Sequence, residues 1–428
     1  MQTYAKNSSK PNIRKNSVLF RLIIIILLIG IFFRFFNLDK KLYWIDEAYT
    51  SLRIAGHTEA EIRPQFFEGE ILSNKDMQKD QHLNPEKGVM DTLKSLAAED
   101  AQHPPLYYLM LRYWMQWFGN SVIAIRSLSA FISLLIFPCL YWLCTELFKS
   151  PNVTWVAIAI IAISPFHVLY AQEAREYGLW TITILLSSAA LLWAMRVKTK
   201  ISWITYALTV VLGLYTYIFT GLIVVGHGIY VIAVEQFKLS KTLKKYLLAS
   251  LVGLIAFVPW ILVVLNSFNR IQSTTSWMNE TTNPLSLITR WAGNLSRIFL
   301  DLGVDANDSL SSTVFLIPLI LILLVLLGYS IYFLIRTTPK RAWLFVLTLV
   351  AVTPIVLRVP DLIVGGRRSG TARYLIPSYL GIQITVAYLL ATKINPISRQ
   401  IRQQKLWKCN RSGGRSASGK NCDQNLVM

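Results

Sequence analysis

The chain carries little charge and almost no cysteine for its size. Charged residues make up 15% of its 428 residues, hydrophobic residues make up 54%, and the mean hydropathy is +0.44. This balance excludes a soluble globular protein and predicts an all-α, polytopic membrane protein. Cys139 and Cys144 lie within one apolar run and Cys409 and Cys422 near the C-terminus. The sequence therefore predicts neither a disulfide framework nor a zinc site.

Acidic residues are also scarce, with 23 Asp and Glu against 43 Lys and Arg, a formal charge of +20. The basic residues fall in short blocks between apolar runs, where the positive-inside rule explains them, so nucleic acid is not expected as a partner. We predict that all of these blocks face the cytoplasm. They are Lys6, Lys10, Arg14 and Lys15; Arg196, Lys198 and Lys200; Lys238, Lys241, Lys244 and Lys245; Arg336, Lys340 and Arg341; and the tail from Lys393.

The apolar runs predict about ten transmembrane helices with both termini inside. The first, residues 18–36, is longer than the apolar part of a signal peptide and no small-residue cleavage site follows it, so it reads as an uncleaved anchor. Arg21 and Arg34 lie near its ends, where their side chains are expected to reach the interface. The other predicted spans are 122–147, 152–171, 177–195, 202–218, 219–235, 246–265, 313–335, 342–358 and 374–391.

These spans predict one membrane domain, 18–391, between a basic cytoplasmic N-terminus, 1–17, and a polar cytoplasmic tail, 392–428. Residues 37–100 hold 13 acids and 8 Lys and Arg, a net charge of 8 − 13 = −5, which predicts an outer location. The predicted outer loops are 37–120, with interfacial helices, 266–311 and 359–373. The tail is rich in Gly and Ser and is expected to be disordered or truncated.

Two adjacent acids, Asp46 and Glu47, follow the first apolar run closely enough to lie one to two helical turns outside the hydrocarbon. Acids at a membrane surface favour a catalytic function, with one carboxylate taking a proton. Together with His103 they could also assemble a divalent-cation site. Their spacing does not require one, so no metal or other cofactor is predicted.

Several basic residues lie on the predicted outer face, against the positive-inside trend. Guanidinium groups grip phosphate in a bidentate manner, and the glycines of 365–370 allow close backbone approach to a ligand. We therefore predict an anion site, and the alternative is binding of lipid head groups by a surface loop. The residues predicted to bind the phosphate are Arg126, Arg175, Arg373, His103, Arg367 and Arg368. The predicted supporting residues are Glu173, Tyr374 and Tyr107.

Acids that accept a proton and arginines that hold an anion suit the transfer of a group from a phosphate-linked lipid. Lipid carriers of activated sugars fit this description. His103 precedes two prolines, and its alternative role is that of a local hydrogen-bond partner.

Five short motifs then occur in one order along the chain. They are Trp44-x-Asp46-Glu47; His103-Pro-Pro-Leu-Tyr-Tyr; Phe118-Gly-x-Ser121 with Arg126-x-x-Ser129; Gln172-Glu-Ala-Arg175; and Arg373-Tyr-Leu-x-Pro377. In this order the chain resembles GT-C glycosyltransferases, in the branch of protein O-mannosyltransferases and aminoarabinose transferases. The resemblance covers residues 18–391. The tail after Trp407 departs from the family pattern, which continues with further crossings and an outer C-terminal domain.

The resemblance implies a polyprenyl-phosphate sugar donor, an inverting displacement, and Asp46 as the general base, with Glu47 in a supporting place. The acceptor would be a hydroxyl or phosphate of a lipid, glycan or protein at the outer face of the plasma (inner) membrane. Membrane lipids are the other expected partners. The alternatives are a lipid-linked saccharide transporter or flippase and an inactive lipid-binding remnant. Internal repeats and mid-membrane charges, typical of transporters, are not evident, which favours an interfacial enzyme.

Overall fold

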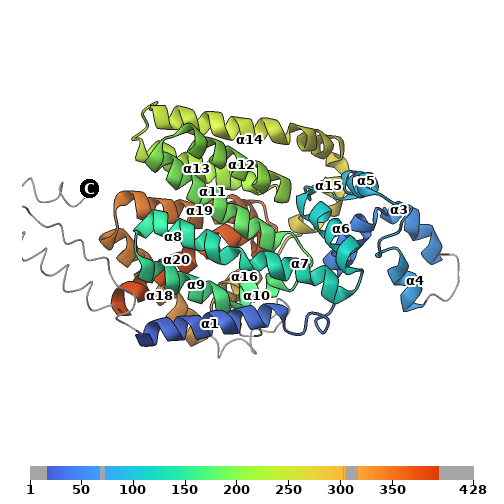
Figure 1. The fold of residues 1–428 in the computed structure, drawn as a ribbon, viewed down its shortest axis with the longest axis horizontal. Coiled ribbons are helices and arrows are strands. Elements are labelled where there is room, and N and C mark those ends of the chain that lie inside the picture. Colours follow the sequence, from blue (N-terminus) through green and yellow to red (C-terminus); the bar gives the residue numbers. More distant parts are fainter. Residues whose placement is uncertain (1–16, 68–72, 302, 304–316, 395–428) are drawn as a thin grey trace, which may run out of the picture.

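The computed structural model describes residues 17–67, 73–301, 303 and 317–394. Within these residues all regular structure is helical, which confirms the predicted all-α class (Figure 1). Of the predicted terminal segments, only residue 17 and residues 392–394 are described. The basic block before the first span, Cys409 and Cys422, and part of the loop 266–311 lie outside the described residues.

Apolar helices form a bundle, and several of the remaining helices gather at one end of it (Figure 1). The bundle contains α1 Ser17–Phe35, α7 Val122–Leu134, α8 Ile136–Phe148, α9 Pro151–Ile163, α10 Pro165–Ala171, α11 Tyr177–Val197, α12 Lys200–Thr216, α13 Thr220–Val234, α14 Lys241–Asn266, α18 Ile317–Thr337, α19 Lys340–Ile363 and α20 Ile376–Ile394. The shorter elements are α2 Ile45–Ala55, α3 Glu59–Ile62, η2 Arg63–Phe67, α4 Asn74–Lys79, α5 Val89–Glu99, α6 Leu106–Phe118, α15 Phe268–Thr274, η3 Ser276–Asn279, α16 Pro284–Arg297, η5 Arg368–Gly370 and η6 Ala372–Leu375.

Fewer helices have the length and hydropathy of a membrane span than the ten crossings predicted. Among the described residues, seven helical stretches are long and apolar enough to cross a membrane, and one of them is α7 and α8 together, Val122–Phe148. The number is eight if α9 and α10 form one broken span with a 62° bend. These eight correspond to eight of the ten predicted crossings. The other two are α12 and α13, whose 17 and 15 residues fall short of the ~20 that a bilayer core needs. The count of ten is therefore not confirmed.

The centre of the bundle is formed by α11 and α20, in which 78% and 83% of the apolar stretch is buried inside the protein. In α1 and α18 the buried share is 17% and 11%. Small residues allow the helices to approach closely. A Cβ atom at Gly30 would lie 2.3 Å from the Ala162 carbonyl oxygen, and one at Gly381 would lie 2.6 Å from a Val350 methyl carbon. The apolar faces of α1 and α18 are thus left for lipid.

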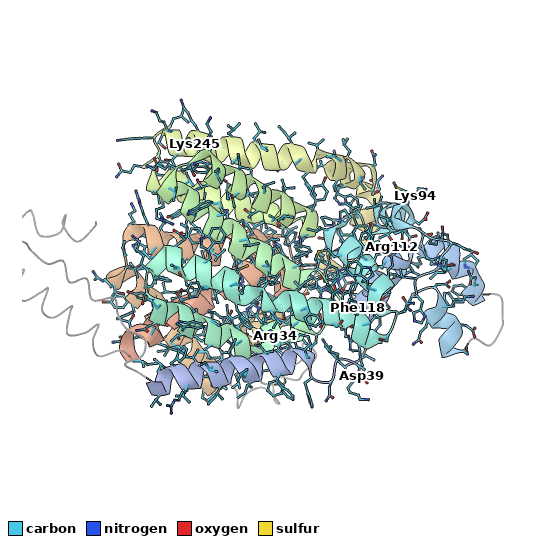
Figure 2. The ribbon with its side chains drawn as sticks, viewed as in Figure 1. Arg34, Asp39, Lys94, Arg112, Phe118 and Lys245 are labelled. Carbon is cyan, nitrogen blue, oxygen red and sulfur yellow. The ribbon has the colours of Figure 1, made fainter. Side chains whose placement is uncertain are left out.

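Arg34 corrects one prediction, because its side chain is fully buried and does not reach the interface (Figure 2). The kink at Ser164-Pro165 separates α9 from α10, and Pro165 has no N–H to donate to the Ile161 carbonyl. The Arg34 guanidinium donates to the carbonyl oxygens of Ile161, Ala162 and Gly30 at 3.2, 2.6 and 2.7 Å. Arg34 thereby satisfies backbone groups that the helix break leaves open inside the bundle.

Buried arginines join the helices α2, α5 and α6 at this end of the bundle. Arg53 of α2 contacts Glu99 and Asp100 at the end of α5, each at 2.5 Å. Arg112 of α6 donates to the Ile54 carbonyl at 2.6 Å and to Thr92 Oγ1 at 3.0 Å. These contacts hold α2, α5 and α6 together, so α2 is a firm support for the residues at its start.

Candidate functional site

A cavity of about 650 Å³ lies between the short helices α2, α3, α5 and α6 and the adjoining ends of the bundle helices. Its wall comes from α2, the start of α6, the turns after α10 and α12, the α14–η3 segment, and η6. Its ionisable lining residues other than tyrosines are Asp46, Arg53, Glu59, Glu99, Asp100, His103, Arg175, Arg270 and Arg373. Five of the predicted site residues therefore share one cavity: Asp46, His103, Arg175, Arg373 and Tyr374.

Asp46 and Arg373 face each other across this cavity, although 327 positions separate them. Arg373 Nη2 lies 3.5 Å from Asp46 Oδ2, and both side chains keep some exposure, 18% and 26%. Asp46 lies in the first turn of α2, where a helix N-terminus favours a carboxylate. The pair thus brings an acid and a cation within ion-pair distance of each other.

Aromatic rings surround the Arg373 guanidinium. Its central carbon lies 5.4 Å from the ring centre of Trp44 and 5.6 Å from those of Tyr177 and Tyr374. Arg373 Nε is buried and has no hydrogen-bond partner. The rings hold the planar group in place while leaving donors for a further acceptor.

Glu47 and Arg126 form a fully buried ion pair away from the cavity lining. Arg126 Nε and Nη2 donate to Glu47 Oε1 and Oε2 at 2.8 and 2.7 Å, and Nη1 donates to the Leu38 and Lys41 carbonyls. The backbone N–H of Ala174 donates to Glu47 Oε1 at 2.9 Å. This pair joins the segment before α2 to α7 and to the turn that carries Arg175.

Arg175 is buried and donates around the cavity wall. Its acceptors are the Asp46 carbonyl oxygen at 3.3 Å, Thr50 Oγ1 at 2.8 Å, Tyr108 OH at 3.3 Å, Glu176 Oε1 at 3.3 Å and Tyr177 OH at 3.4 Å. His103 Nε2 lies 3.4 Å from Arg175 Nη2, and His103 Nδ1 lies 2.9 Å from Glu176 Oε1. Arg175 thus connects the start of α2 with His103 and α11.

Two acids near His103 are held ionised by neighbouring cations. Burial alone would raise the pKa of Glu176, but the positive charge of Arg175 and the hydrogen bond with His103 lower it to about 2. Burial would likewise raise the pKa of Asp100, but the charge of Arg53 lowers it. This end of the cavity therefore contains fixed charges of both signs.

Glu173 lies outside the cavity lining. Its carboxylate pairs with Lys41, and its second oxygen is buried without a partner. Burial raises the pKa of Glu173, and Lys41 offsets part of that effect. Tyr107 is fully buried as well, and its hydroxyl lies 2.7 Å from Ser129 Oγ. Glu173 and Tyr107 thus contact residues around the cavity and do not line it themselves.

Arg367 and Arg368 also lie outside the cavity lining and have protein partners. Arg367 donates to the Trp277 carbonyl at 2.9 Å and pairs with Glu280 at 2.9 Å. Arg368 pairs at 3.0 Å with the buried Asp361, and also contacts Asn279. Since Trp277 lines the cavity, the two arginines hold a part of its wall in place.

Sequence reasoning missed several residues of the cavity. Glu176 and Tyr177 directly follow Arg175 and lay within the motif that drew attention to it. Tyr217 gave no signal, because aromatic residues are common at predicted interfaces. No group of three His, Cys, Asp or Glu that could hold a metal ion occurs in the part of the chain that the structure describes.

Part of the chain matches a known family, and the fold resembles that of solved structures. Residues 102–262 match the family described as dolichyl-phosphate-mannose-protein mannosyltransferase. The fold is similar to that of ArnT from Cupriavidus metallidurans bound to undecaprenyl phosphate, with a TM-score of 0.54 and 12% identity over 91% of this chain and 63% of ArnT. For ArnT in the apo state the TM-score is 0.52 and the identity 13%, with the same coverages.

The Archaeoglobus fulgidus oligosaccharyltransferase complex with Zn and sulfate gives a TM-score of 0.46 and 15% identity, over 95% of this chain and 57% of that one. No curated protein matches the chain. The chain spans less than two thirds of the length of ArnT. The fold is similar to that of ArnT and residues 102–262 match a mannosyltransferase family, which agrees with the predicted resemblance to GT-C glycosyltransferases.

Proposed function

We propose that this chain is a membrane glycosyltransferase that moves a sugar from a polyprenyl-phosphate donor to a hydroxyl or phosphate of an acceptor at the outer face of the plasma membrane. The observation that carries the proposal is the pairing of Asp46 with Arg373 in one cavity of a chain with the GT-C fold. The crystal structure of ArnT with undecaprenyl phosphate supports the class of donor.

In this proposal Asp46 is the general base. Its carboxylate takes the proton from the acceptor oxygen, which attacks the anomeric carbon on the face opposite the phosphate. The bond from that carbon to the phosphate oxygen breaks, and its electron pair stays on the phosphate. The configuration of the sugar is inverted, and no covalent sugar–enzyme intermediate is needed.

Arg373 and Arg175 stabilise the negative charge that develops on the departing phosphate. The free Nε of Arg373 and its aromatic surroundings support this role. Arg126 donates hydrogen bonds to Glu47 and to a backbone carbonyl oxygen, that of Leu38. We therefore assign them to the positioning of Asp46, and we assign Arg367 and Arg368 to the support of Trp277.

The test is release of lipid phosphate from a panel of polyprenyl-phosphate sugars by the purified chain in nanodiscs. We expect Asp46→Asn to lower the rate by roughly 100-fold or more, because it removes the base with almost no change of shape. Asp39→Asn is the matched control, since Asp39 is an exposed acid of the same outer segment and pairs with Lys40 (Figure 2).

A rate that is unchanged in Asp46→Asn would overturn the assignment of the base. A wild-type chain that binds a donor and releases no lipid phosphate, with or without an acceptor, would overturn the proposed activity. The donor that reacts would also identify the sugar.

A further inference from the structure

A buried carboxylate reaches the cavity through one histidine. Glu176 is fully buried at the start of α11, and His103 lies between it and the cavity. Glu176 Oε1 lies 2.9 Å from His103 Nδ1 and 3.3 Å from Arg175 Nη2. On its other side, His103 Nε2 lies 3.4 Å from the same Arg175 nitrogen. The three side chains therefore form a closed triangle of contacts at the cavity wall.

The chemistry of the three groups determines which ring nitrogen carries the hydrogen. Glu176 is ionised, so its carboxylate only accepts hydrogen bonds. Its contact with His103 then requires a hydrogen on Nδ1. The Arg175 guanidinium only donates, so its contact requires a lone pair on Nε2. His103 is therefore a neutral imidazole in the Nδ1–H form, which is the less common form of a free histidine side chain in water.

We propose that Glu176 is a positioning residue that acts through His103, holding the ring in its Nδ1–H form so that Nε2 keeps the Arg175 guanidinium at the cavity wall, facing the departing phosphate. Without the ring, Arg175 Nη2 is free to form a closer ion pair with Glu176 and to turn away from the cavity. This inference rests on the proposed function, because it assigns Arg175 to the phosphate.

Other groups around His103 are consistent with this form of the ring. Its backbone N–H donates to the Asp100 carbonyl at 2.8 Å, which fixes the start of the segment. The rings of Tyr108 and Tyr217 lie 6.4 Å from the imidazole centre on other sides. The Asp100 carboxylate is engaged by Arg53 at 2.5 Å. Glu176 is therefore the carboxylate that contacts the imidazole directly.

The first test is the ¹⁵N spectrum of the chain with labelled histidine in nanodiscs, with the His103 signals assigned by their loss in His103→Asn. We expect Nδ1 to be protonated and Nε2 unprotonated at neutral pH. In Glu176→Gln the charge that holds the hydrogen on Nδ1 is gone, so the signals should move toward a mixture of both forms. Glu173→Gln is the matched control, because Glu173 is a buried acid that pairs with Lys41, and it should leave the His103 signals unchanged.

A wild-type spectrum with the hydrogen on Nε2, or Glu176→Gln signals identical to those of wild type, would overturn the inference. The wild-type spectrum decides the first point even if Glu176→Gln does not fold. Since the spectrum needs no substrate, this outcome is independent of whether the proposed function is correct.

The second test is kinetic and uses a double-mutant cycle. If Glu176 acts through His103, then Glu176→Gln and His103→Asn should each lower kcat about tenfold, and the double variant should be no slower than His103→Asn alone. The KM for the acceptor should stay unchanged in all three. Multiplicative losses in the double variant would show that Glu176 acts independently of His103 and would overturn the inference.

Discussion

Two acids that are adjacent in the sequence occupy entirely different surroundings. Asp46 lines the cavity and retains 26% exposure, while Glu47 is fully buried against Arg126. Successive residues of a helix point about 100° apart, so one of two neighbours can face a cavity while the other faces the core. The proposed division of work, a base and an anchor, follows from this rotation.

The Glu47–Arg126 pair leads to a prediction about stability. Glu47→Gln or Arg126→Met leaves one buried charge without its partner, and we expect each change to lower the free energy of unfolding by about 3 kcal/mol. The double variant should lose clearly less than the sum of the two, because no unpaired charge remains. Chemical unfolding of the four proteins in detergent measures this, and additive losses would contradict it.

Glu176 leads to a prediction about pH. Its pKa is lowered to about 2 in the folded chain, below the ordinary value of 4.5. The ionised carboxylate therefore contributes stability that is complete above pH 5 and is lost as the pH falls from 5 toward 2. Relative to Glu176→Gln, wild type should be more stable at pH 7, and the difference should shrink on acidification.

Unfolding midpoints of both proteins between pH 7 and pH 3 check this expectation. The remaining acids titrate in both proteins, so their effects cancel in the difference. A gap that stays constant across this range would mean that Glu176 is not ionised by its neighbours in the folded state.

At the scale of helices, Arg34 links α1 to the break between α9 and α10. In Arg34→Leu the carbonyl oxygens of Ile161 and Ala162 lose their donor inside the bundle, and we expect a loss of roughly 1–3 kcal/mol. Arg21→Leu is the control, since Arg21 lies on the same helix with an exposed side chain. Equal stabilities of the two variants in thermal unfolding would contradict a role for Arg34 in this break.

At the scale of the whole molecule, α14 runs from the bundle end that carries Lys245 to the end where the outer helices gather, with Lys94 nearby (Figure 2). Its 26 residues span about 39 Å, enough to cross a bilayer. Both lysines are exposed, and the proposed topology puts them on opposite sides of the membrane.

We expect a membrane-impermeant maleimide to label Lys94→Cys in intact cells and to label Lys245→Cys only after the membrane is opened. The four native cysteines are replaced by Ala in both proteins, so that each reports one position. Labelling of both positions in intact cells, or of Lys245→Cys alone, would contradict the proposed orientation.

Composition, apolar runs and short motifs predicted a large part of this protein. Runs of apolar residues gave the all-α membrane class, eight of the predicted spans correspond to long apolar helices, and the five motifs gave the GT-C resemblance. These features are local, because burying a helix in lipid depends on about 20 consecutive side chains. The helices α12 and α13, with 17 and 15 residues, are shorter than this length.

Tertiary structure alone decided which outer charges share a cavity. Arg126, Arg373 and Arg175 are equivalent in the sequence, because each is a cation next to a predicted span. In the structure, Arg126 forms a buried ion pair with Glu47, and Arg373 faces Asp46. Such a choice depends on helix rotation and on partners as distant as 327 positions, and neither is contained in a local pattern. The sequence by itself thus determined the membrane fold and the motifs, while packing determined which side chains meet and whether each lies in the cavity or in the core.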